Sequence, residues 1–334
     1  MKLTCVTAVW NAIAAGNRDK LIRCVKTVGA LKTEHEHLLM DGASTDGTVE
    51  LLRELEKEVP GLKVLSSKDT GIYNALNKGL AAATGEWFYV LGSDDFICRP
   101  EVMDALIANE APETEMIVAP VEYGPSKTYA FHKLSDLRGL IRGGYGYCHQ
   151  GLIMKTAVAR KFGGFDERFR LCADGDLLLK VHRSLAKFHY TFEAFANFSP
   201  GGANETNRDG VETETMVFLK EQLGLTDAEA AEQRRTWRPP FHVVRKYYRS
   251  KDVALWIGAR DVADEYLSLL AWSLGLWRIG DFLKRVFWHT VVRIAPAYDF
   301  LRRHRKSPLV RWPLLPAIWL TRPFRRRFNR CCRG

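Results

Sequence analysis

Short apolar runs alternate with segments of helical spacing through the first third of the chain. The apolar runs lie at residues 3–9, 37–40, 62–65, 87–91 and 116–119. Between them, apolar side chains recur every three or four residues, which predicts helices at 19–28, 48–59, 71–83 and 100–108. This order predicts an α/β fold with a mostly parallel, Rossmann-like sheet and helices on both of its faces.

Two adjacent carboxylates, Asp94 and Asp95, follow the apolar run at 87–91. Ligands of open α/β sheets bind at the carboxyl ends of the strands, so this pair lies where a ligand is expected. Adjacent carboxylates repel each other unless they share a cation or a donor, and a divalent metal that carries a phosphate would explain them. The alternative is that Ser93, Asp94 and Asp95 form a turn that caps the helix near Pro100.

Two other predicted strands end in turn-forming residues, at 10–11 and at 41–47. Such residues are common in any turn, but a parallel sheet would bring these loops and the acidic pair towards one crevice. The chain has no Gly-x-Gly-x-x-Gly after the first strand and no Gly-x-x-x-x-Gly-Lys-Ser/Thr motif. A dinucleotide-dependent oxidoreductase and a P-loop nucleotidase are therefore disfavoured.

The composition fits a folded chain of one large domain or two. Of the 334 residues, 46% are hydrophobic and 26% are charged, which argues against wholesale disorder. The seven cysteines are scattered and include no Cys-x-x-Cys pair, so we expect neither a zinc site nor a disulfide framework, and a reducing compartment fits. Polar Asn11 interrupts the apolar stretch at 3–15, which we interpret as the first strand and not as a targeting segment.

Charge divides the chain into two parts. Residues 234–334 contain 23 Lys/Arg and 6 Asp/Glu, a net charge of +17, which leaves −7 for the rest of the chain. Seven of the nine tryptophans lie beyond residue 235, between clusters of basic residues. The apolar pieces there are shorter than the roughly 20 residues of a spanning helix. This pattern predicts amphipathic helices that lie on an anionic membrane surface.

Two other interpretations of the extension at 235–334 stay open. Its helices could pack on the body with their arginines in solvent, or the extension could bind nucleic acid. No nucleic-acid-binding motif supports the second interpretation. We therefore expect an anionic membrane surface as the partner and no nucleic acid.

Several motifs follow one another along the chain, at 41–48, 69–79, 85–95, 148–150, 164–167 with 173–176, and 201–202. In this order they resemble those of the family 2 glycosyltransferases, which have the GT-A fold. The resemblance covers roughly residues 1–220, and the chain looks most like the bacterial members that build surface polysaccharides or lipid-linked oligosaccharides.

The resemblance implies which residues bind the donor. Asp41 matches the acidic residue that hydrogen-bonds the nucleotide base, and its carboxylate suits a uracil N–H, so UDP is favoured. Thr7 and Asn11 are expected in the loop that lines the base and the ribose. Asp94 and Asp95 match the motif that holds the ribose and the Mg²⁺ or Mn²⁺ on the diphosphate.

One departure from the family pattern concerns that acidic motif. Gly92 stands where many relatives have Asp or Asn. Which of Asp94 and Asp95 is the main metal ligand is therefore left open by the sequence.

The resemblance also implies the residues on the acceptor side. Asp174 matches the base that takes the proton of the acceptor hydroxyl in an inverting transfer. Asp176 is the spare, because residues i and i+2 of one helix point apart and cannot both face the site. The alternative is that Asp174 caps a helix at 177–183. His149 and Gln150 are implied to border the donor sugar and the acceptor, unless their loop is simply solvated.

We therefore predict an inverting, metal-dependent glycosyltransferase that moves a sugar from a nucleotide-diphospho-sugar to a lipid-linked glycan during surface polysaccharide synthesis. We expect residues 1–98 to bind the donor, 99–225 to bind the acceptor, and 235–334 to hold the protein peripherally on the cytoplasmic face of the plasma membrane. One alternative is a nucleotidyltransferase, which should have a basic, glycine-rich loop after the first strand, and residues 9–16 contain no Lys or Arg. The other is a non-catalytic, membrane-associated scaffold that kept the fold.

Overall fold

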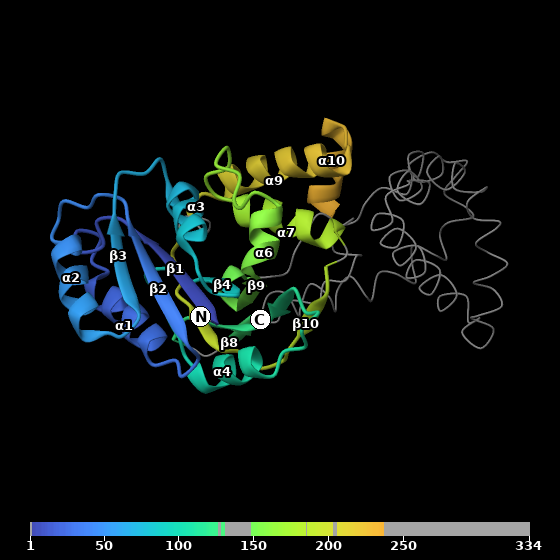
Figure 1. Ribbon diagram of the computed structural model, residues 1–334. Helices are drawn as coiled ribbons and strands as arrows, with labels where there is room; N and C mark the ends of the chain where they lie inside the picture. The colour runs from blue at the N-terminus through green and yellow to red at the C-terminus, as the bar shows by residue number, and fades with distance from the viewer. Residues whose placement is uncertain (1, 126–127, 131–147, 185, 203–205, 237–334) are drawn as a thin grey trace, which may run out of the picture.

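The computed structural model describes residues 2–125, 128–130, 148–184, 186–202 and 206–236 (Figure 1). Nearly all of the basic extension at 235–334 lies outside these residues, and so does the glycine-rich segment at 142–147 that precedes His149. Within the described part of the chain, no helix has the length and apolar character needed to cross a membrane.

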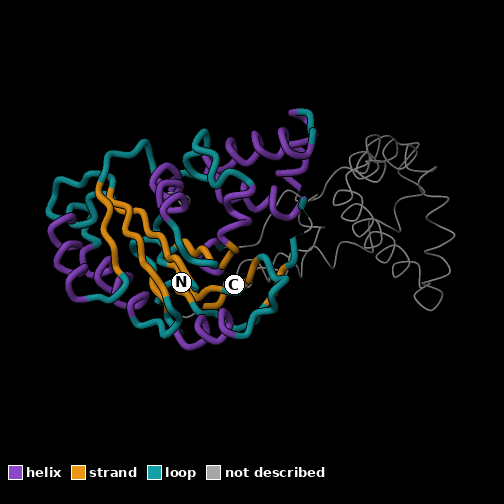
Figure 2. The backbone as a smooth tube through the Cα atoms, viewed as in Figure 1, coloured by secondary structure: helices purple, strands orange, loops and turns teal. Residues whose placement is uncertain are grey.

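A seven-stranded sheet forms the centre of the fold, in the order β10-β6-β9-β4-β1-β2-β3. Figure 2 shows its strands side by side, with helices on both sides. All neighbouring pairs are parallel except those of β9, which runs antiparallel to both β4 and β6. The predicted mostly parallel α/β sheet is thus confirmed. The strands are β1 (Leu3–Val9), β2 (His35–Asp41), β3 (Leu62–Ser66), β4 (Trp87–Val90), β6 (Met116–Val118), β9 (Leu152–Lys155) and β10 (Phe188–Tyr190).

Helices cover both faces of this sheet because neighbouring strand residues point to opposite sides. Leu3 and Cys5 of β1 pack with one group of helices, and Val6 packs with the other. The first group consists of α1 (Arg18–Gly29), α2 (Thr48–Glu58) and α4 (Pro100–Ala108). The second consists of α3 (Ile72–Ala82), α6 (Thr156–Lys161), α7 (Ala173–Arg183) and α9 (Arg208–Leu223), which α10 (Asp227–Thr236) follows. In Figure 1 the second group lies above the sheet, and α4 lies below it.

A smaller sheet joins the two halves of the chain near the acidic pair. Its order is β5-β11-β7-β8, formed by β5 (Phe96–Ile97), β11 (Ala196–Phe198), β7 (Val121–Tyr123) and β8 (Thr128–Ala130). Because β5 begins one residue after Asp95, its pairing with β11 brings Ser199 next to the acidic pair. A short 3₁₀ helix, η1 (His149–Gly151), leads into β9 beside the same loop.

Candidate functional site

The parallel strands β1, β2 and β3 end at one edge of the sheet. Val9 is level with Asp41, and Asp41 is level with Ser66. The loops that follow these strand ends therefore meet, as expected for ligand-binding loops of an open α/β sheet.

Asp41, the last residue of β2, is held through only one of its two oxygens. Its side chain is buried, with 2% of the residue exposed. Oδ2 accepts from Ser66 Oγ at 2.6 Å and from the backbone N–H of Ser44 at 3.1 Å. Oδ1 is buried and has no hydrogen-bond partner among the described residues. A buried carboxylate oxygen without a donor is costly, so it is well suited to a ligand that brings a donor.

Asn11 joins the first two strand-end loops. It adopts a left-handed backbone conformation, with φ of 46°. Its side-chain oxygen accepts from the N–H of Thr45 at 3.0 Å, and its own N–H donates to Ser44 Oγ at 2.7 Å. Asn11 thus lies at the predicted edge of the sheet, where it fixes in place the loop that follows Asp41.

Trp10 and Asp69 are two site candidates that the sequence reasoning did not single out. A Cβ atom added to Gly42 would lie 2.8 Å from Asp69 Oδ2 and 3.3 Å from Trp10 Cδ1, so both side chains border this glycine. Trp10 is 69% exposed, although it directly follows a buried strand. A large exposed aromatic residue at the end of a buried strand was the signal that could have identified it.

The expectation that Thr7 lies in a loop is wrong. Thr7 is inside strand β1 and fully buried. Its Oγ1 lies 3.0 Å from Nε2 of His37, and burial lowers the pKa of that histidine to about 3. A neutral His37 and a buried hydroxyl form an internal contact, and neither reaches the open edge of the sheet.

Asp95 is a buried anchor. Only 1% of the residue is exposed, and both carboxylate oxygens accept hydrogen bonds. Oδ1 accepts from the N–H of Ser199 at 2.7 Å, and Oδ2 accepts from Gln150 Nε2 at 2.6 Å. Burial raises the pKa of Asp95 against the opposing effect of these bonds, and the charge of Asp94 raises it further.

Asp94 is arranged differently. Its backbone carbonyl accepts from Ser199 Oγ at 2.6 Å, which fixes the main chain. The residue is half-buried, and no hydrogen bond or ion pair joins its carboxylate to another of the described residues. Between the two aspartates, Asp94 is therefore the one with oxygens available for a metal.

Gly92 has a steric role in this loop. A Cβ atom at this position would collide with Oδ2 of Asp95, which folds back over the glycine. The loop is not a helix cap, because α4 begins at Pro100 and its N-cap residue is Arg99. The alternative interpretation of Asp94 and Asp95 as a cap of that helix is thus excluded.

Asp174 lies in the first turn of α7, and the N-cap residue is Cys172, so Asp174 is not the predicted cap. Its Oδ2 is 3.6 Å from Nδ1 of His149, and its Oδ1 accepts from the hydroxyl of Tyr73 at 3.2 Å. Burial would raise the pKa of Asp174, but His149, the N–H of Gly175 and Tyr73 together lower it. The carboxylate therefore stays ionised at neutral pH.

His149 lies beside Asp174, and the residue that follows it, Gln150, bonds to Asp95. The side chain of His149 is 34% exposed. Burial lowers the pKa of His149, but Asp174, with smaller contributions from Asp95 and Asp94, raises it above the usual value. The fold therefore places His149 beside Asp174 and within the electrostatic influence of Asp94, although 80 positions separate the two aspartates in the sequence.

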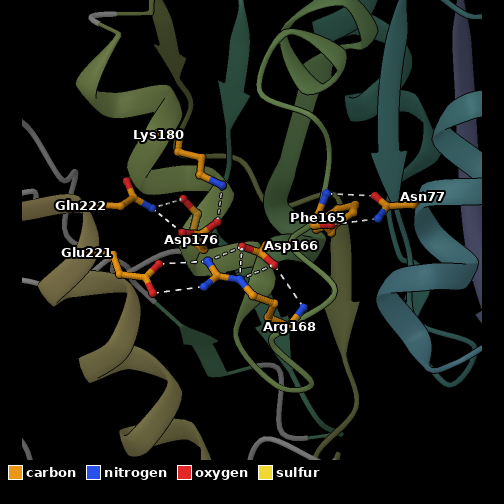
Figure 3. A network of polar contacts seen from close by, with 8 residues as sticks. All are labelled: Asn77, Phe165, Asp166, Arg168, Asp176, Lys180, Glu221 and Gln222. Carbon is orange, nitrogen blue, oxygen red and sulfur yellow. Dashed lines mark hydrogen bonds and ion pairs between the residues drawn. The ribbon is translucent and has the colours of Figure 1, made fainter.

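Gln150 and Asp176 lie inside the protein. Gln150 is buried and bonded to Asp95, so it supports the acidic loop from within. Asp176 is also buried, and it pairs with Lys180 at 2.6 Å and bonds to Gln222 (Figure 3). The argument that Asp174 and Asp176 point apart agrees with this placement.

The loop at 164–167 is held by two asparagines of α3. Asn77 donates to the carbonyl of Phe165 at 2.8 Å and accepts from its N–H at 2.9 Å (Figure 3). Asn74 and Asn77 both donate to the carboxylate of Glu167 at 2.9 Å. The motifs at 69–79 and 164–167, which lie far apart in the sequence, therefore contact each other in the fold.

Helix α9 holds the start of α7. The carboxylate of Glu214 accepts from the backbone N–H groups of Arg170, Leu171 and Cys172 at 2.8–2.9 Å. Nearby, Arg168 bridges Asp166 and Glu221, which Figure 3 shows as a fork between two carboxylates. Successive N–H groups ahead of a helix favour an anion, so Glu214 fixes the turn that presents Asp174.

A metal in this site would have few protein ligands. The described residues contain no group of three or more His, Cys, Asp or Glu side chains arranged around a common point. Mg²⁺ is commonly held by one or two carboxylates together with substrate phosphates, and Asp94 fits that requirement.

Comparison with known proteins agrees with this architecture. Glycosyl transferase family 2 matches residues 4–163. An uncharacterized glycosyltransferase of Mycobacterium tuberculosis is 28% identical over 180 residues, which cover 51% of this chain and 66% of that relative. The chain thus spans somewhat less than two thirds of the length of this relative.

Two solved structures share the fold. S. aureus TarS 1-349 in complex with UDP aligns with a TM-score of 0.52 and 15% identity, over 90% of this chain and 88% of that one. The mannosyltransferase PcManGT from Pyrobaculum calidifontis, in complex with GDP-Man and Mn²⁺, aligns with a TM-score of 0.52 and 15% identity, over 90% and 86% of the two chains. Residues 4–163 of this chain thus match glycosyl transferase family 2, and the described part of the chain shares the fold of these two structures.

Proposed function

We propose that this protein is an inverting glycosyltransferase that uses a nucleotide-diphospho-sugar, with Asp174 as general base and Asp94 as the metal-binding carboxylate. The observation that carries the proposal is the position of η1: His149 lies 3.6 Å from Oδ2 of Asp174, and the next residue, Gln150, bonds to Asp95 of the acidic pair. An inverting transfer needs a base and a leaving-group site on opposite sides of one sugar.

The donor would bind along the edge formed by β1, β2 and β4. The unpaired Oδ1 of Asp41 would accept an N–H of the nucleotide base, and uracil offers one. Trp10 and Asp69, which border Gly42, would line the same end. Solved proteins of this fold are bound to UDP or to GDP-Man, which supports a nucleotide sugar as the donor but does not identify its nucleobase.

A divalent cation, Mg²⁺ or Mn²⁺, would be held by Asp94 together with the donor diphosphate. When bound, it would supply charge to stabilise the departing nucleoside diphosphate. Asp95 would act through its bonds to Gln150 and Ser199, which keep the main chain of Asp94 in place. PcManGT is bound to Mn²⁺ in its solved complex, which is consistent with such a site.

Asp174 would take the proton of the acceptor hydroxyl as that oxygen attacks the sugar. Its lowered pKa keeps it ionised and ready to accept a proton at neutral pH. His149 would orient the carboxylate, and the ion pair between them would weaken as Asp174 becomes protonated.

The acceptor would be a lipid-linked glycan at the cytoplasmic face of the plasma membrane. The support is the sequence of residues 235–334, whose positive charge and tryptophans suit the surface of an anionic membrane. Deletion of this extension should abolish binding to anionic liposomes while the remaining body still binds a nucleotide sugar. Retained liposome binding by a folded truncated protein would contradict the membrane assignment.

A thermal-shift panel of UDP-, GDP- and dTDP-sugars, each with and without Mn²⁺, tests the donor and the metal. The true donor should raise the melting temperature most, and only with the metal, because a ligand of the folded state stabilises it by mass action. An equal, metal-independent response to every nucleotide would contradict the role of Asp94.

Sugar transfer by Asp174→Asn tests the base and separates this proposal from the alternatives. Loss of transfer with intact donor binding is expected. Full activity in this variant would remove Asp174 from the mechanism. A non-catalytic scaffold predicts no transfer by the wild-type protein, and a nucleotidyltransferase predicts pyrophosphate release from a nucleoside triphosphate.

A further inference from the structure

We propose that Tyr73 is a positioning residue for Asp174, through which helix α3 aligns the base with the donor-binding loops. The inference rests on the proposed role of Asp174 as general base. Tyr73 acts on the reaction only through that carboxylate.

Packing around the ring of Tyr73 holds its hydroxyl between two acceptors. The side chain is buried, and its ring stacks on Phe165 with 5.5 Å between ring centroids. The hydroxyl lies 3.2 Å from Oδ1 of Asp174 and 2.9 Å from the carbonyl oxygen of Leu171. A stacked, buried ring cannot swing away, so the hydroxyl fixes the position of Oδ1 while His149 lies beside Oδ2.

A phenol has one proton, and here two acceptors compete for it. While Asp174 is ionised, donation to the carboxylate is favoured, because hydrogen bonds to charged acceptors are the stronger ones. Once Asp174 has taken a proton, the Tyr73 hydroxyl can instead donate to the carbonyl oxygen of Leu171. The pair of acceptors thus serves both protonation states of the base without moving the ring.

The same helix begins at the donor end of the site. Asp69 accepts from the N–H of Gly71 at 3.1 Å just before α3, and its other oxygen borders Gly42. Tyr73 follows two residues later, in the first turn of the helix. The hydrogen bonds of Asn74 and Asn77 to the loop at 164–167 then prevent α3 from sliding.

The charged groups around Asp174 come from three directions. His149 faces Asp174 from η1, and Tyr73 faces it from α3. Cys172 lies at the turn before α7, which the carboxylate of Glu214 reaches from α9. The charges of Asp95 and Asp94 also act on His149. Burial and the neighbouring Asp174 raise the pKa of Tyr73, so its hydroxyl remains a donor throughout the working pH range.

The substitution Tyr73→Phe removes the hydroxyl and keeps the ring. We expect kcat to fall about 10-fold with the KM for the donor unchanged, because one hydrogen bond to a charged group is lost. The acid limb of the pH profile of kcat should move to higher pH, because Asp174 has lost a donor that favours its ionised form. Titration of 13C-labelled aspartate carboxyls by NMR should show the same direction without turnover, with the Asp174 signal identified by its absence in Asp174→Asn.

Phe188→Leu is the matched control, since it loosens the packing of β10 on the far end of α7, where Phe188 stacks on His182, and leaves Tyr73 and its stacking partner in place. It should lower the melting temperature and leave the acid limb and the Asp174 titration unmoved. A wild-type kcat and titration in Tyr73→Phe, or an equal shift in Phe188→Leu, would overturn the inference while Asp174→Asn is inactive. Full transfer by Asp174→Asn would instead overturn the base, and this inference with it.

Discussion

Strand β2 carries a buried carboxylate near each end, and the fold surrounds the two differently. Glu36, at the start of the strand, is 1% exposed and accepts from Thr4 Oγ1 at 2.8 Å, Thr84 N–H at 2.7 Å, Thr84 Oγ1 at 2.6 Å and Lys63 Nζ at 2.8 Å. Asp41, at the end, is 2% exposed, and its Oδ1 has no donor among the described residues.

The difference separates stability from binding within one strand. A fully bonded buried carboxylate supports the folded state, because removing a partner would leave a buried charge uncompensated. A half-bonded one weakens the folded state by itself and gains its missing donor only from a ligand. The amino-terminal edge of the sheet thus holds the fold together, and the carboxyl-terminal edge is prepared for a substrate.

The carboxyl-terminal edge should show the largest effect on activity. In Asp94→Asn we expect kcat to fall on the order of 1000-fold, about 4 kcal/mol, because the metal would lose its protein carboxylate. The melting temperature without ligand should stay unchanged, and the stabilisation by Mn²⁺ with a donor should disappear. Asp95→Asn is the comparison variant: it should lower the melting temperature, because it replaces a buried acceptor of two hydrogen bonds.

The amino-terminal edge should show the largest effect on stability. Glu36→Gln removes an acceptor and leaves Lys63 and Thr84 with fewer bonds, so the free energy of unfolding should fall by about 3 kcal/mol. Urea titration measures this loss. Activity per folded molecule should remain that of the wild type, and a matching loss of kcat would break the division between the two edges.

The carboxylate of Glu36 should also make the stability of the protein depend on pH. Burial alone would raise the pKa of Glu36, but its bonds to Lys63, Thr84 and Thr4 lower it to about 2. A carboxylate with a lowered folded-state pKa contributes stability above its unfolded pKa and loses it as the pH falls towards the folded value. Wild-type stability should therefore drop between about pH 4.5 and pH 2, and this drop should be smaller in Glu36→Gln.

Asp41→Asn is the matched change at the other end of β2. It should weaken donor binding about 10-fold, about 1.4 kcal/mol, because an amide offers one acceptor oxygen in place of two. Isothermal titration with the donor from the thermal-shift panel measures this. Stability without ligand should change much less than in Glu36→Gln, and an equal loss in the two variants would contradict the comparison.

The smallest effect is expected at Thr7. Thr7→Val removes the hydroxyl that meets His37 and should cost about 1 kcal/mol of stability. Because Thr7 is buried inside β1, donor affinity should not change. A clear loss of donor affinity, measured by the same titration, would restore Thr7 to the donor site.

Sequence reasoning predicted the elements that depend on local pattern. The strand at Leu3–Val9 and the helix at Pro100–Ala108 have the predicted bounds. The other elements up to β6 differ from their predicted bounds by one or two residues at one or both ends. What it could not predict depends on distant partners. Strand β9 inserts antiparallel between β4 and β6, and no local pattern in its four residues indicates that position.

The site shows the same limit. The loops at the carboxyl ends of β1, β2 and β4 were predicted, because strand order alone brings them together. Helix α7 begins four residues earlier than expected, at Ala173, since the carboxylate of Glu214 from α9 stabilises a turn that is polar in sequence. The inward direction of Gln150 likewise depends on Asp95, which lies 55 positions away.

Asn77 has a consequence for how this chain can vary. Its side-chain amide donates to and accepts from one residue, Phe165, as the peptide group of a neighbouring strand would. Aspartate would lack the donor, and glutamine would be one methylene too long for both bonds. Half-buried helix positions usually tolerate many residues, but a saturation library of this protein should accept almost nothing but asparagine at position 77.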